Sequence, residues 1–362
     1  MKTLGVTENE QIDRIFLETK ELLKKMIAIP SFSKEEDRTA EAIEHFLQGH
    51  DIPVKRYLNN VWAVNQYFDE KKLTILLNSH HDTVKPNAGY TLPPFEPIEK
   101  EGKLYGLGSN DAGGPLVGLI GTFLFFYSKK DLPFNLVIAA TAEEEISGHD
   151  GIEILLPRLP RIDCGIVGEP TLMKMAIAEK GLLVIDCIAH GAAGHAARNE
   201  GVNAVYKAMK DIQWFSSWQF AKDSKMLGPV HMAVTSIYTD NKAHNIVPSQ
   251  CRFVVDIRVN ERYTFEEVIA EIRKHITSEV LPRSTRLRPS FIAESHPLVK
   301  AGQLLGVEAY GSPTCSDRAL MDFPALKMGP GDSARSHSAN EFIFTDEILK
   351  GIQLYVQLLL NI

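Results

Sequence analysis

The sequence lacks several features that would place it in a specialised class of protein. It has only four cysteines in 362 residues and no CxxC pair, so we expect free thiols in a reducing compartment. The N-terminal stretch MKTLGVTENEQIDRIF has no basic segment followed by an apolar one, which predicts a cytoplasmic protein without a secretory signal. The longest apolar stretch, residues 115–127, is too short to span a bilayer and predicts a buried helix.

An excess of positive charge is also absent. The formal net charge of −7 argues against nucleic acid and anionic membranes as main partners. Apolar residues make up 44% of the chain and charged residues 23%, which is ordinary for a globular protein. The length predicts about two domains, and we find no internal repeat or low-complexity tract.

Strands and helices are expected to alternate along the first half of the chain. The apolar runs that predict strands are residues 73–78, 135–142 and 164–167, and the amphipathic or apolar stretches that predict helices are residues 10–28, 38–48 and 116–127. This alternation is typical of a mostly parallel sheet with helices on both faces, so we predict an α/β fold. A short apolar segment at 326–328 and a helix at 347–360 are expected to complete it.

The pattern changes from about residue 181. The expected strands there are 182–189, 230–238, 251–259 and 285–291, and the expected helices are 203–215 and 265–276. The order βαββαβ predicts an independent, ferredoxin-like small domain. We therefore predict a large domain formed by residues 1–180 and 293–362, with residues 181–292 inserted into it.

Residues that can bind a metal ion follow the predicted strands of the large domain. They are His80 and Asp82, the three residues Glu143 to Glu145, Glu169, Asp111 in GLGSNDAGG, and His337 in ARSHSANE. The carboxyl ends of parallel strands face the ligand crevice, where adjacent carboxylates repel one another unless a cation lies between them. Imidazoles and carboxylates are the ligands of a hydrolytic site with two zinc ions, which needs a bridging carboxylate. Asp111 is the candidate bridge, since a helix start can fix its geometry, and Asp82 can orient the imidazole of His80.

Each of these residues also has a simpler interpretation. His80 alone could be a structural histidine, Asp111 alone could cap a helix, and the glutamates alone could lie in a solvated loop. His337 alone is typical of a polar loop. Only their joint occurrence at strand ends favours a metal site.

Seven motifs occur in the order of a known family. They are SHHDTV, GLGSNDAGG, TAEEE, GEPT, GAAGHAA, HNIVPSQCRFVVDIR and SHSANEF. With them the chain, from about Leu22 to the C-terminus, resembles the dinuclear zinc acetylornithine deacetylase family. That family also holds the succinyl-diaminopimelate desuccinylases, aminoacylases and glutamate carboxypeptidases. The resemblance implies a zinc-exopeptidase-like α/β domain, an inserted dimerisation domain, and two zinc ions per subunit, for which cobalt can substitute.

The resemblance also implies roles for individual residues. One zinc would be held by His80, Asp111 and Glu169, and the other by Asp111, Glu145 and His337. Glu144 matches the general base and Asp82 the residue beside the first histidine, while Glu143 would not be a ligand, although three glutamates in a row allow a slip of one. His195 matches a histidine that reaches the partner subunit's active site, and Asn245 and Arg258 match positions that hold the substrate. Without the resemblance, these last three residues would be interpreted as ordinary surface residues.

The expected activity is the removal of an N-acyl group from an amino acid by a homodimer. We favour N-acetyl-L-ornithine, or its N-succinylornithine or N-acetylcitrulline variant, in arginine biosynthesis. The alternatives are succinyl-diaminopimelate desuccinylase, a lysine-biosynthesis deacylase or a small metallo-dipeptidase. Many relatives carry Asp-Met-Lys-Gly where this chain has Asp111-Ala112-Gly113-Gly114, so a lysine beside the site is lost. A non-catalytic relative, or a hydrolase using His337 and Ser338 as a nucleophilic pair without a G-x-S-x-G motif, remains as an alternative.

Overall fold

The computed structural model describes residues 3–239 and 241–362, which form two compact units. Unit 1 comprises Met1–Ile177, Phe291–Tyr310 and Ser316–Ile362, and unit 2 comprises Ala178–Ser290 and Gly311–Cys315. The chain therefore passes from unit 1 into unit 2 twice, once for most of unit 2 and once for Gly311–Cys315.

The large sheet has the strand order β1-β2-β6-β3-β7-β17-β8-β15, and β16 pairs with β8. Its strands are β1 (Lys55–Tyr57), β2 (Asn60–Val64), β3 (Leu73–His80), β6 (Phe134–Thr141), β7 (Cys164–Val167), β8 (Met175–Glu179), β15 (Ser290–Phe291), β16 (Ala309–Ser312) and β17 (Ala325–Lys327). The central strands β6, β3, β7 and β17 are parallel, whereas β1 and β2 are antiparallel additions at one edge. The prediction of a mostly parallel sheet is confirmed.

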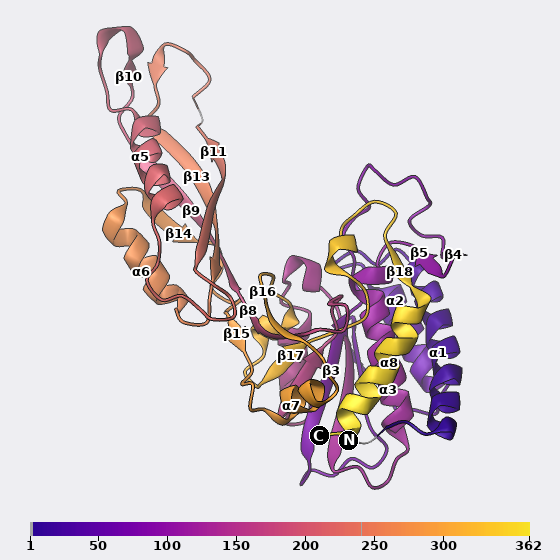
Figure 1. Ribbon diagram of the computed structural model, residues 1–362. Helices are drawn as coiled ribbons and strands as arrows, with labels where there is room; N and C mark the ends of the chain where they lie inside the picture. The colour runs from indigo at the N-terminus through magenta and orange to yellow at the C-terminus, as the bar shows by residue number, and fades with distance from the viewer. Residues whose placement is uncertain (1–2, 240) are drawn as a thin grey trace. The chain divides into compact units, whose positions relative to one another are not determined.

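Helices cover both faces of this sheet. On one face α3 (Gly114–Tyr127) packs against β3 and β6 and between α1 (Val6–Ile27) and α8 (Thr345–Leu360), as Figure 1 shows. On the other face α4 (Ile152–Leu155) packs against a cluster that contains Trp62, Leu76 and Val137. The remaining elements of unit 1 are α2 (Asp37–Gln48), α7 (Pro297–Leu304) and a small antiparallel sheet of β4 (Ile98–Lys100), β5 (Lys103–Tyr105) and β18 (Phe342–Phe344).

Unit 2 has the predicted βαββαβ order, with one strand misplaced. It runs β9 (Gly181–His190), α5 (Ala204–Ser217), β11 (His231–Tyr238), β13 (Gln250–Val259), α6 (Phe265–His275) and β14 (Glu279–Pro282), and its antiparallel sheet has the order β11-β13-β9-β14. The short pair β10 (Gly194–His195) and β12 (Ile246–Val247) is separate from this sheet.

The strand predicted over residues 285–291 is confirmed only at Ser290–Phe291 (β15), which pairs with β8 in the large sheet and not with the strands of unit 2. The fourth strand of unit 2 is β14, where Val280 is buried in the core that lies between the sheet and the two helices. Residues 283–289 are neither strand nor helix, and within them the backbone N–H of Arg286 donates to Ser284 and that of Arg288 to the Arg286 carbonyl. A single buried apolar residue is too weak a signal to mark a strand as short as β14.

In the described part of the chain, no helix is long and apolar enough to cross a membrane. Cys164, Cys187 and Cys251 are buried free thiols. The helix that was expected from the apolar stretch of residues 115–127 is α3, whose side chains are almost all buried.

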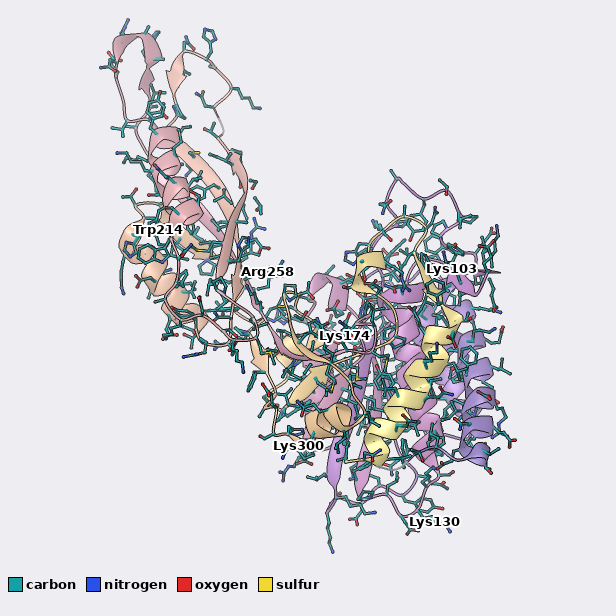
Figure 2. All side chains as sticks on the ribbon, in the orientation of Figure 1. Lys103, Lys130, Lys174, Trp214, Arg258 and Lys300 are labelled. Carbon is teal, nitrogen blue, oxygen red and sulfur yellow. The ribbon has the colours of Figure 1, made fainter. Side chains whose placement is uncertain are left out.

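A buried carboxylate holds the end of α6 against α5, and its loss should destabilise unit 2. Asp211 of α5 accepts hydrogen bonds from the backbone N–H and the hydroxyl of both Thr277 and Ser278. We expect Asp211→Ala to lower the free energy of unfolding by about 2–3 kcal/mol, because it leaves the buried donors of Ser278 without an acceptor. Urea unfolding followed by the fluorescence of Trp214, on the same helix (Figure 2), measures the effect. The exposed Asp223→Ala serves as the control, and an equal loss there would contradict the prediction.

Candidate metal centre

The register of the parallel sheet brings three of the predicted ligand segments to one edge. His80 is the last residue of β3 and pairs with Thr141, the last residue of β6. Glu144 and Glu145 follow β6 in a short 3-10 turn, and Glu169 lies two residues beyond β7, which pairs with β3 on its other side. Hydrogen bonding between strands therefore determines how these side chains are placed relative to one another.

His80 presents one free ring nitrogen to a group of carboxylates. Its Nδ1 donates to the backbone carbonyl of Asp82 at 3.0 Å, and the Asp82 carboxylate lies 3.3 Å from the same nitrogen. Its buried Nε2 has no hydrogen-bond partner among the described residues and lies 3.3 Å from Asp111, 3.8 Å from Glu169 and 3.9 Å from Glu144. A carbonyl accepts only, so Nδ1 carries a proton, and Nε2 is the nitrogen that faces the carboxylates and could bind a metal ion. This is the arrangement of a metal-binding histidine.

Asp111 lies between His80 and the second predicted histidine. Its Oδ1 is the atom near His80, while its Oδ2 lies 3.7 Å from Nε2 of His337. The same nitrogen of His337 lies 3.0 Å from Glu145, whose carboxylate raises the pKa of His337 to about 9. A carboxylate with one oxygen toward each histidine suits a ligand shared by two ions.

Two overlapping groups of residues have ligand atoms within 4.8 Å of one another. One group is His80, Asp111 and Glu145, and the other is His80, Glu144 and Glu169. The five expected ligands are therefore gathered in one place, with His337 reaching it through Glu145 and Asp111. The groups do not reproduce the predicted division of these residues between two ions, which stays a prediction.

The electrostatics of the cluster favour a bound cation. Burial raises the pKa of Glu144 well above its usual value, and nearby carboxylates, including Glu169, raise it further. Burial and Asp111 similarly raise the pKa of Glu169 to about 8. Burial opposes protonation of His80, yet the carboxylates of Asp111 and Asp82 outweigh burial and raise its pKa. Positive charge is therefore stabilised here, and divalent ions would supply it.

The three consecutive glutamates have different surroundings. The backbone N–H groups of Glu144 and Glu145 donate to the Asp82 carboxylate at 3.1 and 3.2 Å, which fixes these two residues beside His80. Glu143 has a positive φ of 57°. Its carboxylate packs against Gly148 so closely that a Cβ added to this glycine would lie only 1.8 Å from Oε2 of Glu143. Glu143 therefore points into the loop at residues 148–150 and belongs to neither group of ligand atoms.

Two buried carboxylates near the centre were missed by the sequence analysis. Glu341 accepts the backbone N–H groups of Gly108, Asn110 and Asp111 at 3.1, 2.8 and 2.9 Å. Asp317 accepts hydrogen bonds from Asn78 and Thr141 behind the ends of β3 and β6. Their partners lie far away in the sequence, so no local pattern marks them, although Glu341 is part of the motif SHSANEF.

The geometry of Asp111 differs from the predicted helix start. α3 begins only at Gly114, and Asp111 has φ −120° and ψ 101°, which is not helical. The three N–H groups bound by Glu341, rather than the first turn of α3, therefore hold this segment in place.

Comparison with known proteins assigns the family. The sequence profile of Peptidase family M20/M25/M40 matches residues 76–361, which is well over half of the chain. The chain belongs to this family. As a member of the M20 family it is a metal-dependent amide hydrolase, in agreement with the motifs. This assignment replaces the alternatives of a non-catalytic relative and of a serine-type hydrolase.

Relatives and solved structures are similar over most of the chain. An acetylornithine deacetylase from Edwardsiella ictaluri is 28% identical over 93% of this chain and 96% of its own length. A succinyl-diaminopimelate desuccinylase from Ruegeria sp. is 25% identical over 70% of this chain and 68% of its own length. The crystal structure of a dinuclear metal binding peptidase of the M20 family from Bacillus subtilis has a TM-score of 0.74 at 13% identity and covers 96% of this chain and 98% of its own. At that identity the structural likeness supports the fold alone.

The remaining candidate residues of this M20 family protein lie in unit 2. His195 is exposed at the end of β10, where it pairs with Ile246 of β12. Asn245 directly precedes β12, and its carbonyl accepts the N–H of Ala196. Arg258, labelled in Figure 2, is near the far end of β13, and its guanidinium forms two hydrogen bonds with Asp256 at 2.8 and 3.0 Å. The structure thus places His195 and Asn245 together and Arg258 elsewhere in the unit.

Proposed function

We propose that the protein removes an N-acyl group from an amino acid with two zinc ions held by His80, Asp111, Glu145, Glu169 and His337. The observation that carries this proposal is the buried Nε2 of His80, which faces three carboxylates without a hydrogen-bond partner among the described residues. Imidazole and carboxylate ligands suit zinc, and cobalt accepts the same ligands. Bound divalent ions would polarise the amide carbonyl and ease deprotonation of a water molecule.

Glu144 is the proposed general base. Its carboxylate lies 3.9 Å from His80 at the centre of the ligand group, and burial raises its pKa toward the range in which a carboxyl group can accept a proton and return it. Its backbone is fixed by Asp82, so its side chain starts from a defined position. Glu144 would take a proton from the attacking water and give it to the leaving amine.

N-acetyl-L-ornithine is the proposed substrate, in keeping with the relative from Edwardsiella ictaluri. A succinyl group would need a further cation for its second carboxylate. Arg318 is buried and donates to the carbonyls of Ala176 and Ile177, and Arg335 forms a two-point ion pair with Glu347. These arginines are engaged within unit 1, which favours acetyl over succinyl.

Succinyl-diaminopimelate is the second candidate, because several similar relatives are named desuccinylases. Lys180 and Arg198, both in unit 2, would then be the cations for the succinyl carboxylate. Lys180 donates to the carbonyl of Pro229, and Arg198 is exposed.

A homodimer would account for the separation of the candidate substrate residues. In β13 Arg258 lies eight residues after Gln250, about 26 Å away at roughly 3.3 Å per residue, and Asn245 and the β10–β12 pair that holds His195 lie at the Gln250 end. One N-acyl amino acid is too small to touch both ends of this strand. We propose that Arg258 binds the substrate carboxylate and that His195 and Asn245 serve the active site of the partner subunit.

A panel of N-acetyl and N-succinyl derivatives of ornithine, citrulline, lysine and diaminopimelate tests the substrate. We expect kcat/KM to be highest for N-acetylornithine, because a succinyl carboxylate left without a cation in a closed site costs about 1–3 kcal/mol or more, equivalent to roughly 10- to 100-fold. A higher kcat/KM for N-succinyl-diaminopimelate would replace this assignment with the second candidate.

Removal of metal should abolish activity reversibly. A chelator followed by gel filtration should leave folded protein without activity, and two equivalents of Zn²⁺ or Co²⁺ per chain should restore it, because the carboxylate cluster needs cations to be stable. Metal content and hydrolysis are measured on the same samples. Full activity in protein that holds no metal would exclude the proposed mechanism.

A further inference from the structure

The proposed ligands lie on two kinds of backbone. His80 ends β3, and Glu145 and Glu169 follow β6 and β7, so the pairing of these strands sets their relative positions. Asp111 and His337 instead lie on irregular segments, one before α3 and the other after the turn at Ser333–Arg335. His337 has a φ of 56°, and no strand pairs these two segments directly. The nearest strand pairing, between β5 and β18, ends at Tyr105 and Phe342, so contacts beyond that pairing must hold Asp111 and His337 in register.

The first link runs from the His337 loop to the Asp111 segment. Glu341, only 2% exposed, follows His337 by four residues, and one of its oxygens accepts the N–H groups of both Asn110 and Asp111. Its other oxygen accepts the N–H of Gly108 at 3.1 Å. The carboxylate thus holds three N–H groups of the turn that carries Asp111.

The second link runs in the opposite direction. The side chain of Asn110, which is fully buried, donates to the carbonyl of Asp332 and accepts its N–H, both at 3.0 Å. The amide also reaches the hydroxyl of Ser336 at 3.4 Å, next to His337. The side chain of Asn110 therefore holds Asp332, at the start of the His337 loop, while Glu341, at the end of that loop, holds the backbone of Asn110.

We propose that Asn110 and Glu341 form a reciprocal clamp that positions Asp111 and His337 as a pair of metal ligands. The inference rests on the proposed dinuclear site and adds two positioning residues that touch neither metal nor substrate. Loosening the clamp should lower the affinity for the ion shared by Asp111 and His337 more than the affinity for the ion held through His80 and Glu169. Loss of a partner behind a metal ligand typically costs about 10- to 100-fold in metal affinity.

The chain offers a matched control. Asn135 is also fully buried and makes the same two-point contact with a backbone, donating to the carbonyl of Asp69 and accepting its N–H. It lies at the start of β6, the end of the strand opposite to the site. Asn135→Ala should therefore lower thermal stability much as Asn110→Ala does, without affecting metal binding.

The experiment titrates metal-depleted full-length protein with Co²⁺ by calorimetry and by the visible absorption of bound cobalt. Wild type and Asn135→Ala should take up two ions per chain. Asn110→Ala and Glu341→Gln should bind the first ion nearly as tightly and the second about 10- to 100-fold more weakly. Glu341→Gln keeps the size of the side chain but places an amide NH₂ against the N–H of Gly108. It therefore tests the clamp even where Asn110→Ala does not fold.

The outcomes separate the clamp from the proposed function. Two tightly bound ions in both clamp variants would overturn the clamp and leave the dinuclear site intact. An equal loss of affinity for the second ion in Asn135→Ala would also overturn the clamp, because it would show that lower stability alone weakens metal binding. A wild-type chain that binds no pair of ions would overturn the dinuclear proposal itself, and the clamp's role with it.

Discussion

Replacing Glu144 by glutamine should reduce kcat by about 10²- to 10⁴-fold, which is the usual contribution of a positioned general base. The amide keeps the shape of the side chain but cannot take a proton from water or return it to the amine. Metal binding should persist, because His80, Asp111, Glu145, Glu169 and His337 remain. Steady-state kinetics and metal analysis of the same preparation measure the two properties separately.

The neighbouring glutamate supplies the control for this prediction. Glu143→Gln removes the same charge one residue earlier, but Glu143 points into the loop at residues 148–150 and belongs to neither group of ligand atoms. Its kcat should stay close to that of wild type. If Glu144→Gln loses a metal ion instead, Glu144 is a ligand, as its grouping with His80 and Glu169 allows. If Glu143→Gln loses the activity, the roles are shifted by one residue.

The sequence predicts best what a regular backbone positions. The ends of β3, β6 and β7 are visible as apolar runs that stop at polar residues, and the sheet then brings His80, Glu145 and Glu169 together. The strand β14 was missed because it contributes a single buried apolar side chain, Val280, whereas the charged stretch after it mimics an alternating pattern. Short strands are defined by their partners, which a single segment does not reveal.

The supporting carboxylates could not be predicted for a related reason. Glu341 meets Asn110 across a separation of 231 residues, and Asp317 meets Asn78 across 239. Each accepts hydrogen bonds from groups that become adjacent only once the fold is formed. The sequence therefore indicates the ligands, because histidine, aspartate and glutamate are known metal-binding residue types. It does not indicate the residues that hold these ligands in place.

We propose that His195 donates a hydrogen bond to the oxyanion that develops on the substrate carbonyl. His195→Ala should then lower kcat by about 10²- to 10³-fold, the typical cost of losing one such donor. His195 is exposed at the end of β10, and its Nδ1 accepts the N–H of Ala197, so Nε2 is the nitrogen available to a substrate. The thermal midpoint should hardly change, because an exposed side chain with one local hydrogen bond contributes little to stability. Steady-state kinetics and thermal unfolding of the variant measure the two effects.

Mixing two inactive variants decides whose active site His195 serves. In the proposed homodimer, a mixed dimer of Glu144→Gln and His195→Ala contains one site with an intact Glu144. If His195 acts across the interface, that site also receives an intact histidine from the partner. Random mixing of equal amounts should restore about a quarter of the wild-type activity, because half of the dimers are mixed and each has one competent site. If His195 acts within its own chain, every site in the mixture lacks one of the two groups. Activity that stays at the level of the separate variants, in a mixture shown to contain mixed dimers, would therefore place His195 in its own subunit's site and contradict the proposal.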